Sequence, residues 1–184
     1  MSVAEFEGWA PPFELQDRRW QLVDGEPVCM APPSVDHGAI QSETGRLIAN
    51  HLAAARPGCR VITTPGIVPR VKSDTNERVP DLGVTCAPIR AERTLSDPLL
   101  LIEILSPSNE AATRANVWAY VSLPTVREVL LLSSTSVCAE LLRREAGGDW
   151  PELPEIVSDG QVLSLRSIGF EAALRSLYAT SSLG

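Results

Sequence analysis

The chain contains almost no lysine. Lys72 is the single lysine among 16 basic residues, and 23 acidic residues give a formal net charge of −7. Proteins bind the phosphates of nucleic acids through clustered basic side chains, so an acidic chain needs a local arginine patch to bind DNA or RNA. The overall charge excludes general attraction to nucleic acid.

Long apolar segments are also absent. The longest apolar run, residues 98–102, is far shorter than the ~20 residues that a membrane-spanning helix needs. The N-terminus carries Glu5 and Glu7, where a signal peptide has a basic segment followed by an apolar one. We therefore expect a cytoplasmic protein without a membrane-spanning segment.

Motifs for the common cofactors and for zinc are missing. The chain has no GxGxxG or GKS/GKT phosphate loop, no GxSxG elbow and no HExxH sequence. Two histidines cannot build a zinc site alone, and the cysteines lie far apart with no CxxC pair. In a cytoplasmic protein we predict four reduced thiols, at Cys29, Cys59, Cys86 and Cys138.

The residues that are present suit one globular domain. A length of 184 residues, with 44% apolar and 21% charged residues, is typical of a folded domain. We predict a single domain over residues 1–184, with a core of about 14–178 and loosely held tails at both ends.

Strand patterns outnumber helical ones along the chain. A turn at Asp24-Gly25 predicts a hairpin over residues 19–30, and apolar periodicity predicts helices over 37–57 and 110–121. The other predicted elements are a closing helix at 168–177 and strands at 60–64, 67–71, 79–86, 99–105, 126–132, 137–144 and 162–165. This order predicts an α/β or α+β fold with a mixed sheet flanked by helices and an N-terminal β-hairpin.

Two acidic residues occupy positions where strands are expected to be buried. Asp81 begins one predicted strand, and Glu103 interrupts the otherwise apolar strand 99–105. A buried carboxylate is costly unless a cation or a hydrogen-bond donor meets it. If the two strands are neighbours, both carboxylates can bind one Mg²⁺ or Mn²⁺ ion. Alternatively, Glu103 points to a sheet edge or pairs with Arg114.

Five sequence blocks carry a resemblance to a known family. They are Leu22-Val-Asp-Gly-Glu26, Met30-Ala-Pro-Pro-Ser-Val-Asp-His37, Val79-Pro-Asp-Leu-Gly-Val84, Ile102-Glu-Ile-Leu-Ser-Pro-Ser108, and Tyr120 through Leu123-Pro-Thr-Val-Arg-Glu128. In this order they resemble the Uma-two family of restriction endonuclease-like proteins, members of the PD-(D/E)XK nuclease superfamily. The resemblance spans roughly residues 14 to 145.

The resemblance implies a fold, a metal site and an activity. The fold is restriction-endonuclease-like, with about four core strands flanked by helices, and such proteins are commonly homodimers. Mg²⁺ is expected at Asp81 and Glu103, with the backbone carbonyl of Ile104 completing the protein ligands. The implied reaction is hydrolysis of a DNA phosphodiester bond by in-line attack of water.

The chain departs from the superfamily pattern at the lysine. The residue two positions after Glu103 is Leu105, and the family often moves the lysine to the following helix, where this chain has Val117 between Thr113 and Tyr120. Valine can neither orient water nor stabilise phosphate charge. Lys72 is a weak candidate substitute, and Arg114 lies about one hundred degrees around the helix from that row.

Polar and aromatic residues near the predicted site have two interpretations each. His37 matches a frequent family histidine. In a functional role it orders water or a phosphate, and in a structural role it bonds a strand carbonyl. Gln41 shares its helix face and can line a cleft, whereas Glu43 points elsewhere and is expected to be solvated. Trp20 and Trp118 are expected to lie in the core or at a dimer interface.

Two functional hypotheses follow. In the first, the protein is a Mg²⁺-dependent DNA endonuclease in which Asp81 and Glu103 hold the metal and His37 or Gln41 orients water. In the second, which the missing lysine favours, it is a catalytically dead dimeric module of the same fold that binds DNA or a protein.

Overall fold

The fold is built on a six-stranded mixed sheet. The structure, a computed structural model, describes residues 1–91 and 93–184. The strand order is β3-β4-β5-β6-β7-β8, and every neighbouring pair is antiparallel except β5 and β6, which are parallel. The strands are β3 (Arg60–Thr63), β4 (Leu82–Thr85), β5 (Pro98–Leu105), β6 (Glu128–Ser133), β7 (Cys138–Arg143) and β8 (Glu155–Ser158).

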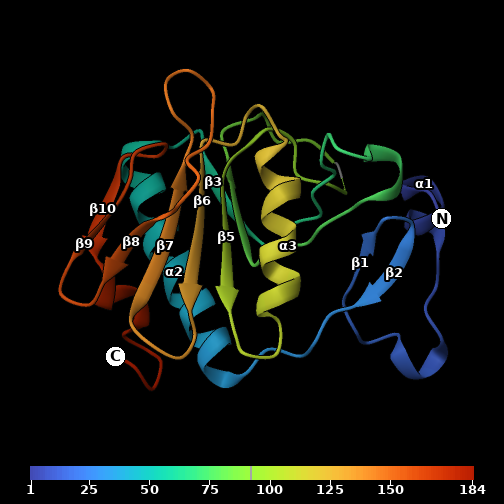
Figure 1. The fold of residues 1–184 in the computed structure, drawn as a ribbon, viewed down its shortest axis with the longest axis horizontal. Helices are drawn as coiled ribbons and strands as arrows, with labels where there is room; N and C mark the ends of the chain where they lie inside the picture. Colours follow the sequence, from blue (N-terminus) through green and yellow to red (C-terminus); the bar gives the residue numbers. More distant parts are fainter. Residues whose placement is uncertain (92) are drawn as a thin grey trace.

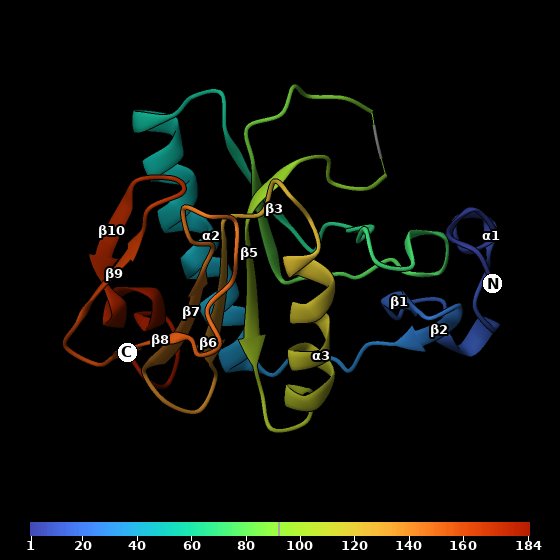
Figure 2. The same cartoon turned by 45° about the horizontal axis from the view of Figure 1, so that its top comes forward.

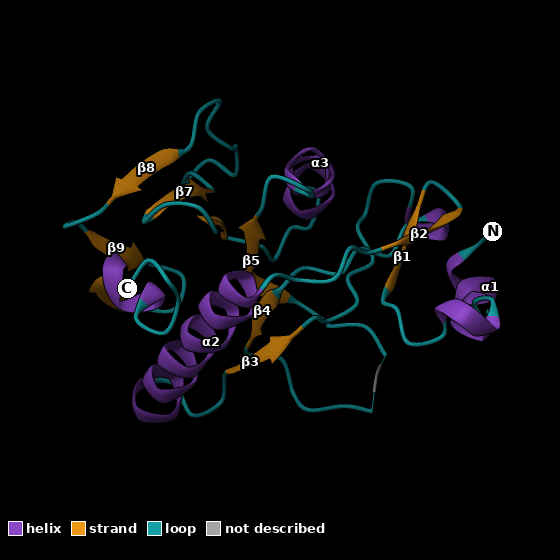
Figure 3. Cartoon of the chain, turned by 90° about the horizontal axis from the view of Figure 1, so that it is seen from below, coloured by secondary structure: helices purple, strands orange, loops and turns teal. Residues whose placement is uncertain are grey.

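Helices cover both faces of this sheet. The long helix α2 (Val35–Ala55) lies on one face, and α3 (Glu110–Val121) lies on the other (Figures 1 and 3). The Ser34 side chain accepts a hydrogen bond from the backbone N–H of His37, which caps the N-terminus of α2. The α3 helix forms the crossover connection that the parallel strands β5 and β6 require.

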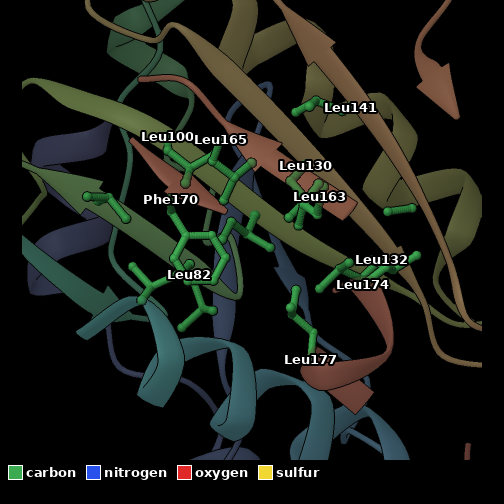
Figure 4. Packing of buried hydrophobic residues seen from close by; sticks show 14 of the residues in the cluster. Leu82, Leu100, Leu130, Leu132, Leu141, Leu163, Leu165, Phe170, Leu174 and Leu177 are labelled. Atoms are coloured by element: carbon green, nitrogen blue, oxygen red, sulfur yellow. The ribbon is translucent and has the colours of Figure 1, made fainter. Parts of the chain in front are cut away.

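The alternation of side chains along β5 divides the core in two. Leu100, Ile102 and Ile104 belong to the cluster on the α2 face, where α2 is joined by β9 (Val162–Leu165), β10 (Phe170–Ala173) and the 3-10 helix η3 (Leu174–Tyr178) (Figure 4). Leu101 and Leu105 belong to the cluster on the α3 face. Because side chains alternate along a strand, Glu103 also points to the α3 face.

A separate hairpin lies beside the sheet. It consists of β1 (Trp20–Val23) and β2 (Glu26–Cys29), and it stands apart from the six strands on the side of α3 (Figure 2). Its two-residue turn, Asp24-Gly25, has positive φ at both positions, as a tight hairpin needs. Two backbone hydrogen bonds between Leu22 and Glu77 connect the hairpin to the segment before β4.

Several expected elements are observed, and two are not. The mixed α+β architecture, the hairpin and both helices are confirmed, and the predicted bounds of α3 match the observed ones. The closing helix expected at 168–177 is wrong, because this segment forms β10 and then the 3-10 helix η3. The strand expected at 67–71 is reduced to one bridge, between Ile67 and Arg78.

Three short helical elements that the sequence does not predict occur near the N-terminus and before β4. The N-terminal segment forms α1 (Val3–Gly8) and the 3-10 helix η1 (Phe13–Leu15), and η2 (Ser73–Thr75) precedes β4. At the C-terminus, the backbone N–H and the hydroxyl of Ser182 both donate to the Asp36 carboxylate. The terminal segments, expected to be loosely held, therefore make tertiary contacts.

Among the helices of the described residues, none combines the length and the apolar character that a membrane-spanning segment needs.

The prediction of four reduced cysteines is wrong for one pair. Cys59 and Cys86 form a disulfide, whereas Cys29 and Cys138 are free. The physical reason is strand register: Arg60 pairs with Thr85 at one end of the β3–β4 ladder, so the next residues outward lie opposite each other. Their Cα atoms are 4.0 Å apart.

We expect reduction of this disulfide to lower the free energy of unfolding by about 3 kcal/mol, because the bond closes a loop across 27 positions of the sequence. Urea unfolding with and without dithiothreitol, and of Cys59→Ser, measures the effect. Cys29→Ser, at an exposed free cysteine, is the matched control and should unfold like the wild type. Equal unfolding midpoints in both redox states would contradict the prediction.

Candidate functional site

The register of two strands brings the predicted acidic pair together. Leu82 pairs with Ile102 across β4 and β5, and this register places Asp81, just before β4, opposite Glu103. Both carboxylates are buried and line the same cavity. The two strands are therefore neighbours, which is the condition for both carboxylates to bind one ion.

Asp81 is held by groups from both α2 and β5. His37 Nε2 donates to Asp81 Oδ1 at 2.8 Å, and the backbone N–H of Ile104 donates to Asp81 Oδ2 at 2.7 Å. Gln41, one turn further along α2, donates from Nε2 to the backbone carbonyl of Asp81 at 2.8 Å. His37 and Gln41 thus fix the position of Asp81, through its side chain and its main chain respectively.

Glu103 is held by neutral donors on α3. The Tyr120 hydroxyl donates to Glu103 Oε1 at 2.6 Å, and Asn116 Nδ2 lies 3.4 Å from the same oxygen. Burial, and then the negative charge of Asp81, raise the pKa of Glu103 to about 8, although the donors partly offset this rise. Burial and the Glu103 charge also raise the pKa of Tyr120. A buried carboxyl with a strongly shifted pKa in a cavity is a frequent feature of functional sites.

The cavity lies between the hairpin and α3. Its volume is about 200 Å³. Residues of the hairpin and of the following segment, including Arg19, Gln21 and Val28, form one side. The start of α3 and the segment before it form the opposite side, and His37, Gln41, Val79, Asp81 and Glu103 lie between them.

Lys72 and Arg114, the two basic residues considered from the sequence, lie outside this cavity. Lys72 pairs with Asp24 at 3.0 Å, and Arg114 pairs with Glu110 and Glu140, so the alternative of an Arg114–Glu103 pair is wrong. Among the described residues that line the cavity there is no lysine.

Ile104 and Val117 are placed differently from the lining residues. Ile104 is buried in the core on the α2 face, and its carbonyl accepts a long hydrogen bond, 3.4 Å, from Asn109 Nδ2. Val117 packs against the apolar cluster of the α3 face and lines a separate surface hollow.

Two further expectations need correction. Glu43 was expected to be solvated, but it is buried, and its carboxylate pairs with Arg46, three residues later on α2. Trp118 is 79% exposed and is not a core residue; its alternative role at a dimer interface stays a prediction. Trp20 is half-buried against Trp9, with ring centroids 5.0 Å apart.

Sequence reasoning missed several polar residues of the cavity. Asn116 and Gln21 are both buried, and Asn116 Nδ2 lies 3.4 Å from Gln21 Oε1. Asn116 occurs three residues after Thr113 and four before Tyr120, so its helical spacing is a signal that sequence inspection can find. Arg19 gave no such signal, because only the folded hairpin brings it to the cavity.

The donor set is compatible with a hard divalent ion. Within residues 1–91 and 93–184, no group of three His, Cys, Asp or Glu side chains is arranged to hold a metal by itself. Mg²⁺ typically keeps several waters and needs only one or two protein carboxylates, which Asp81 and Glu103 can provide. These oxygen donors fit Mg²⁺ or Mn²⁺ and do not fit a structural zinc site.

A family model described as "Putative restriction endonuclease", Uma2, matches residues 3–175. The chain belongs to the Uma2 family. A relative, the uncharacterised protein slr1290 of Synechocystis, is 32% identical over 181 residues, which cover 97% of this chain and 91% of the relative.

A solved structure supports the same fold. The crystal structure titled as a putative nuclease belonging to DUF820 from Anabaena variabilis aligns with a TM-score of 0.74. The alignment covers 97% of this chain and 98% of that one at 17% sequence identity, so the likeness concerns the fold alone. The expected family and nuclease-like architecture are both confirmed.

The shifted pKa of Glu103 predicts a pH-dependent stability for this Uma2 protein without metal. Between the ordinary pKa of 4.5 and about 8, the folded state keeps a proton that the unfolded chain releases, so stability falls as the pH rises. We expect a smaller fall in Glu103→Gln, which has no such proton. The measurement is urea unfolding in EDTA across this pH range. Glu14→Gln, at an exposed position, should keep the wild-type slope, and an unchanged slope in Glu103→Gln would refute the prediction.

Proposed function

We propose that this protein is a Mg²⁺- or Mn²⁺-dependent endonuclease that hydrolyses phosphodiester bonds of DNA. The observation that carries the proposal is the pair of buried carboxylates, Asp81 and Glu103, on one cavity of a nuclease-family fold. In this proposal the two carboxylates hold the ion, and the carbonyl of Ile104, at the same end of β5, is the third protein oxygen. The chemistry that such an ion supplies is activation of water and neutralisation of phosphate charge.

The surrounding residues have distinct roles in this proposal. His37 and Gln41 hold Asp81 through hydrogen bonds of 2.8 Å, which keeps its carboxylate facing the cavity. Tyr120 and Asn116 do the same for Glu103. Because the carboxylates are positioned before any substrate binds, little reorganisation is needed during the reaction.

Arg19 is the residue that we propose contacts a DNA phosphate. It is the one Lys or Arg side chain among the described residues that line the cavity. Its side chain is exposed, and its backbone carbonyl accepts a hydrogen bond from Met30, which holds residue 19 at the open end of the hairpin. A guanidinium group can bind phosphate oxygens in a bidentate manner, so it suits this position in an otherwise acidic protein.

A binding module without cleavage is the second candidate function. The observation in its favour is that no lysine lines the cavity among the described residues, although a lysine normally orients the attacking water in this superfamily. Such a module would keep the metal site and bind DNA through the same cavity. The first experiment below separates the two candidates.

We expect Mn²⁺ to raise the melting temperature of the wild type and to support nicking of supercoiled plasmid. An ion at 100 times its dissociation constant stabilises the folded state by about 2.7 kcal/mol, and this gain should vanish in Glu103→Gln. Asp81→Ala should abolish nicking. Glu110→Gln, an exposed change at the start of α3, is the control and should keep both properties.

The outcomes separate the candidates clearly. Stabilisation by Mn²⁺ without nicking favours the binding module. Nicking that persists in Asp81→Ala, or a melting temperature that does not respond to Mn²⁺ or Mg²⁺, contradicts the proposed metal-dependent nuclease.

We expect Arg19→Ala to weaken DNA binding in a salt-dependent manner. Loss of one phosphate contact should reduce the slope of log K against log salt by about 0.9 for duplex DNA. Fluorescence anisotropy of a labelled duplex, measured in EDTA to prevent cleavage, gives this slope. Arg18→Ala removes the adjacent exposed arginine and is the matched control. An equal loss in both variants would show that Arg19 has no special contact.

A further inference from the structure

The α3 side chains that face the two carboxylates do not include Val117, the position where the family often has its lysine. Thr113 and Asn116 line the cavity, and Tyr120 reaches Glu103 with its hydroxyl. Val117 is turned toward the apolar cluster of the α3 face instead. Besides the Tyr120 hydroxyl, the α3 side chain within reach of Glu103 is therefore the amide of Asn116.

The orientation of the Asn116 amide is set by an arginine outside α3. Arg78 Nη1 donates to Asn116 Oδ1 at 3.2 Å. A guanidinium group has donors and no acceptor, so the amide must present its oxygen to Arg78. Its Nδ2 group then faces the opposite way, 3.4 Å from both Glu103 Oε1 and Gln21 Oε1.

Arg78 is itself firmly placed, yet its charge lacks a direct counter-ion. Its backbone pairs with Ile67 in both directions, and its Nη2 donates to Asn76 Oδ1 at 2.8 Å. Arg78 is half-buried, its Nε is buried without an acceptor, and it forms no ion pair with the described residues. Asp24, reached through Asn76, is paired with Lys72.

Burial disfavours the guanidinium charge of Arg78, and the negative charge of Asp24, reached through Asn76, offsets part of this cost. The carboxylate of Glu103 lies on the other side of the Asn116 amide, and Asp81 lies beyond it. Arg78 and the acidic pair are thus connected through the side chain of Asn116. This connection runs from the segment before β4, through α3, to β5.

We propose that Arg78 acts through Asn116 to replace the missing lysine of this site. Arg78 is a positioning residue: it holds the donor side of the Asn116 amide toward Glu103 and the cavity, where Nδ2 can also donate to a phosphate oxygen of the substrate. The inference rests on the proposed nuclease function and assigns the electrostatic role of the lysine to a residue three positions before Asp81.

A double-mutant cycle tests this relay. We expect Arg78→Gln and Asn116→Ala each to lower the kcat of plasmid nicking by about tenfold, with a smaller effect on KM. If Arg78 acts through Asn116, the double variant should nick no more slowly than Asn116→Ala alone. Arg78→Lys, which keeps the charge, should recover part of the loss. Arg70→Gln, an exposed arginine before β4, is the control.

A second readout does not depend on activity. In ¹⁵N-labelled protein, the side-chain amide signals of Asn116, assigned by their loss in Asn116→Asp, should shift in Arg78→Gln and stay unchanged in Arg70→Gln. Melting temperatures establish that each variant is folded before either readout is interpreted.

The outcomes distinguish failure of the relay from failure of the function. A wild type that nicks, with Arg78→Gln at the wild-type rate or with multiplicative losses in the double variant, overturns the relay and leaves the nuclease function standing. Unchanged Asn116 signals in Arg78→Gln overturn it as well. A wild type that does not nick with any metal ion tested overturns the proposed nuclease function and, with it, the positioning role of Arg78.

Discussion

The burial of two neighbouring carboxylates is the constraint on which the site depends. Asp81 and Glu103 lie side by side because β4 and β5 pair in one register, and each loses most of its hydration there. A buried carboxylate keeps its charge only when donors or a cation surround it, and the donors around Glu103 offset only part of the rise in its pKa. The donors come from α2, from the β5 backbone and from α3, so the sheet and both helices must be assembled before the site exists.

The hairpin outside the sheet completes this arrangement. It is connected to the segment before β4 through Leu22 and Glu77, and its Gln21 lies beside Asn116 of α3. These contacts enclose the region around Asp81 and Glu103 as a cavity between the hairpin and α3. The hairpin contributes little to the apolar core; its main structural consequence is the shape and polarity of the cavity.

Local patterns in the sequence predict the elements that are specified locally. The strand β5 is apolar on both faces, and α3 has clear limits, so both were predictable, as was the meeting of Asp81 and Glu103. The Cys59–Cys86 disulfide was not, because it depends on the register between β3 and β4 rather than on cysteine spacing. On α3, Asn116 and Val117 both fit the helical spacing between Thr113 and Tyr120, so the sequence alone does not show which of them faces Glu103. Packing decides, because the apolar Val117 faces the apolar cluster.

A second buried carboxylate shows why burial alone does not mark a functional site. Glu128, on β6, is as buried as Glu103, but Arg143 Nε donates to its Oε1 at 2.8 Å. The backbone N–H groups of Arg166 and Ser167 and the Ser167 hydroxyl add three further donors. The charge of Glu128 is therefore balanced by Arg143, and both of its carboxylate oxygens accept hydrogen bonds, as expected for a structural ion pair. Among the described residues Glu103 has only neutral donors, and the acidic Asp81 lies beside it on the same cavity. A bound cation, or a reaction that binds phosphate through one, can balance the excess of negative charge at this site.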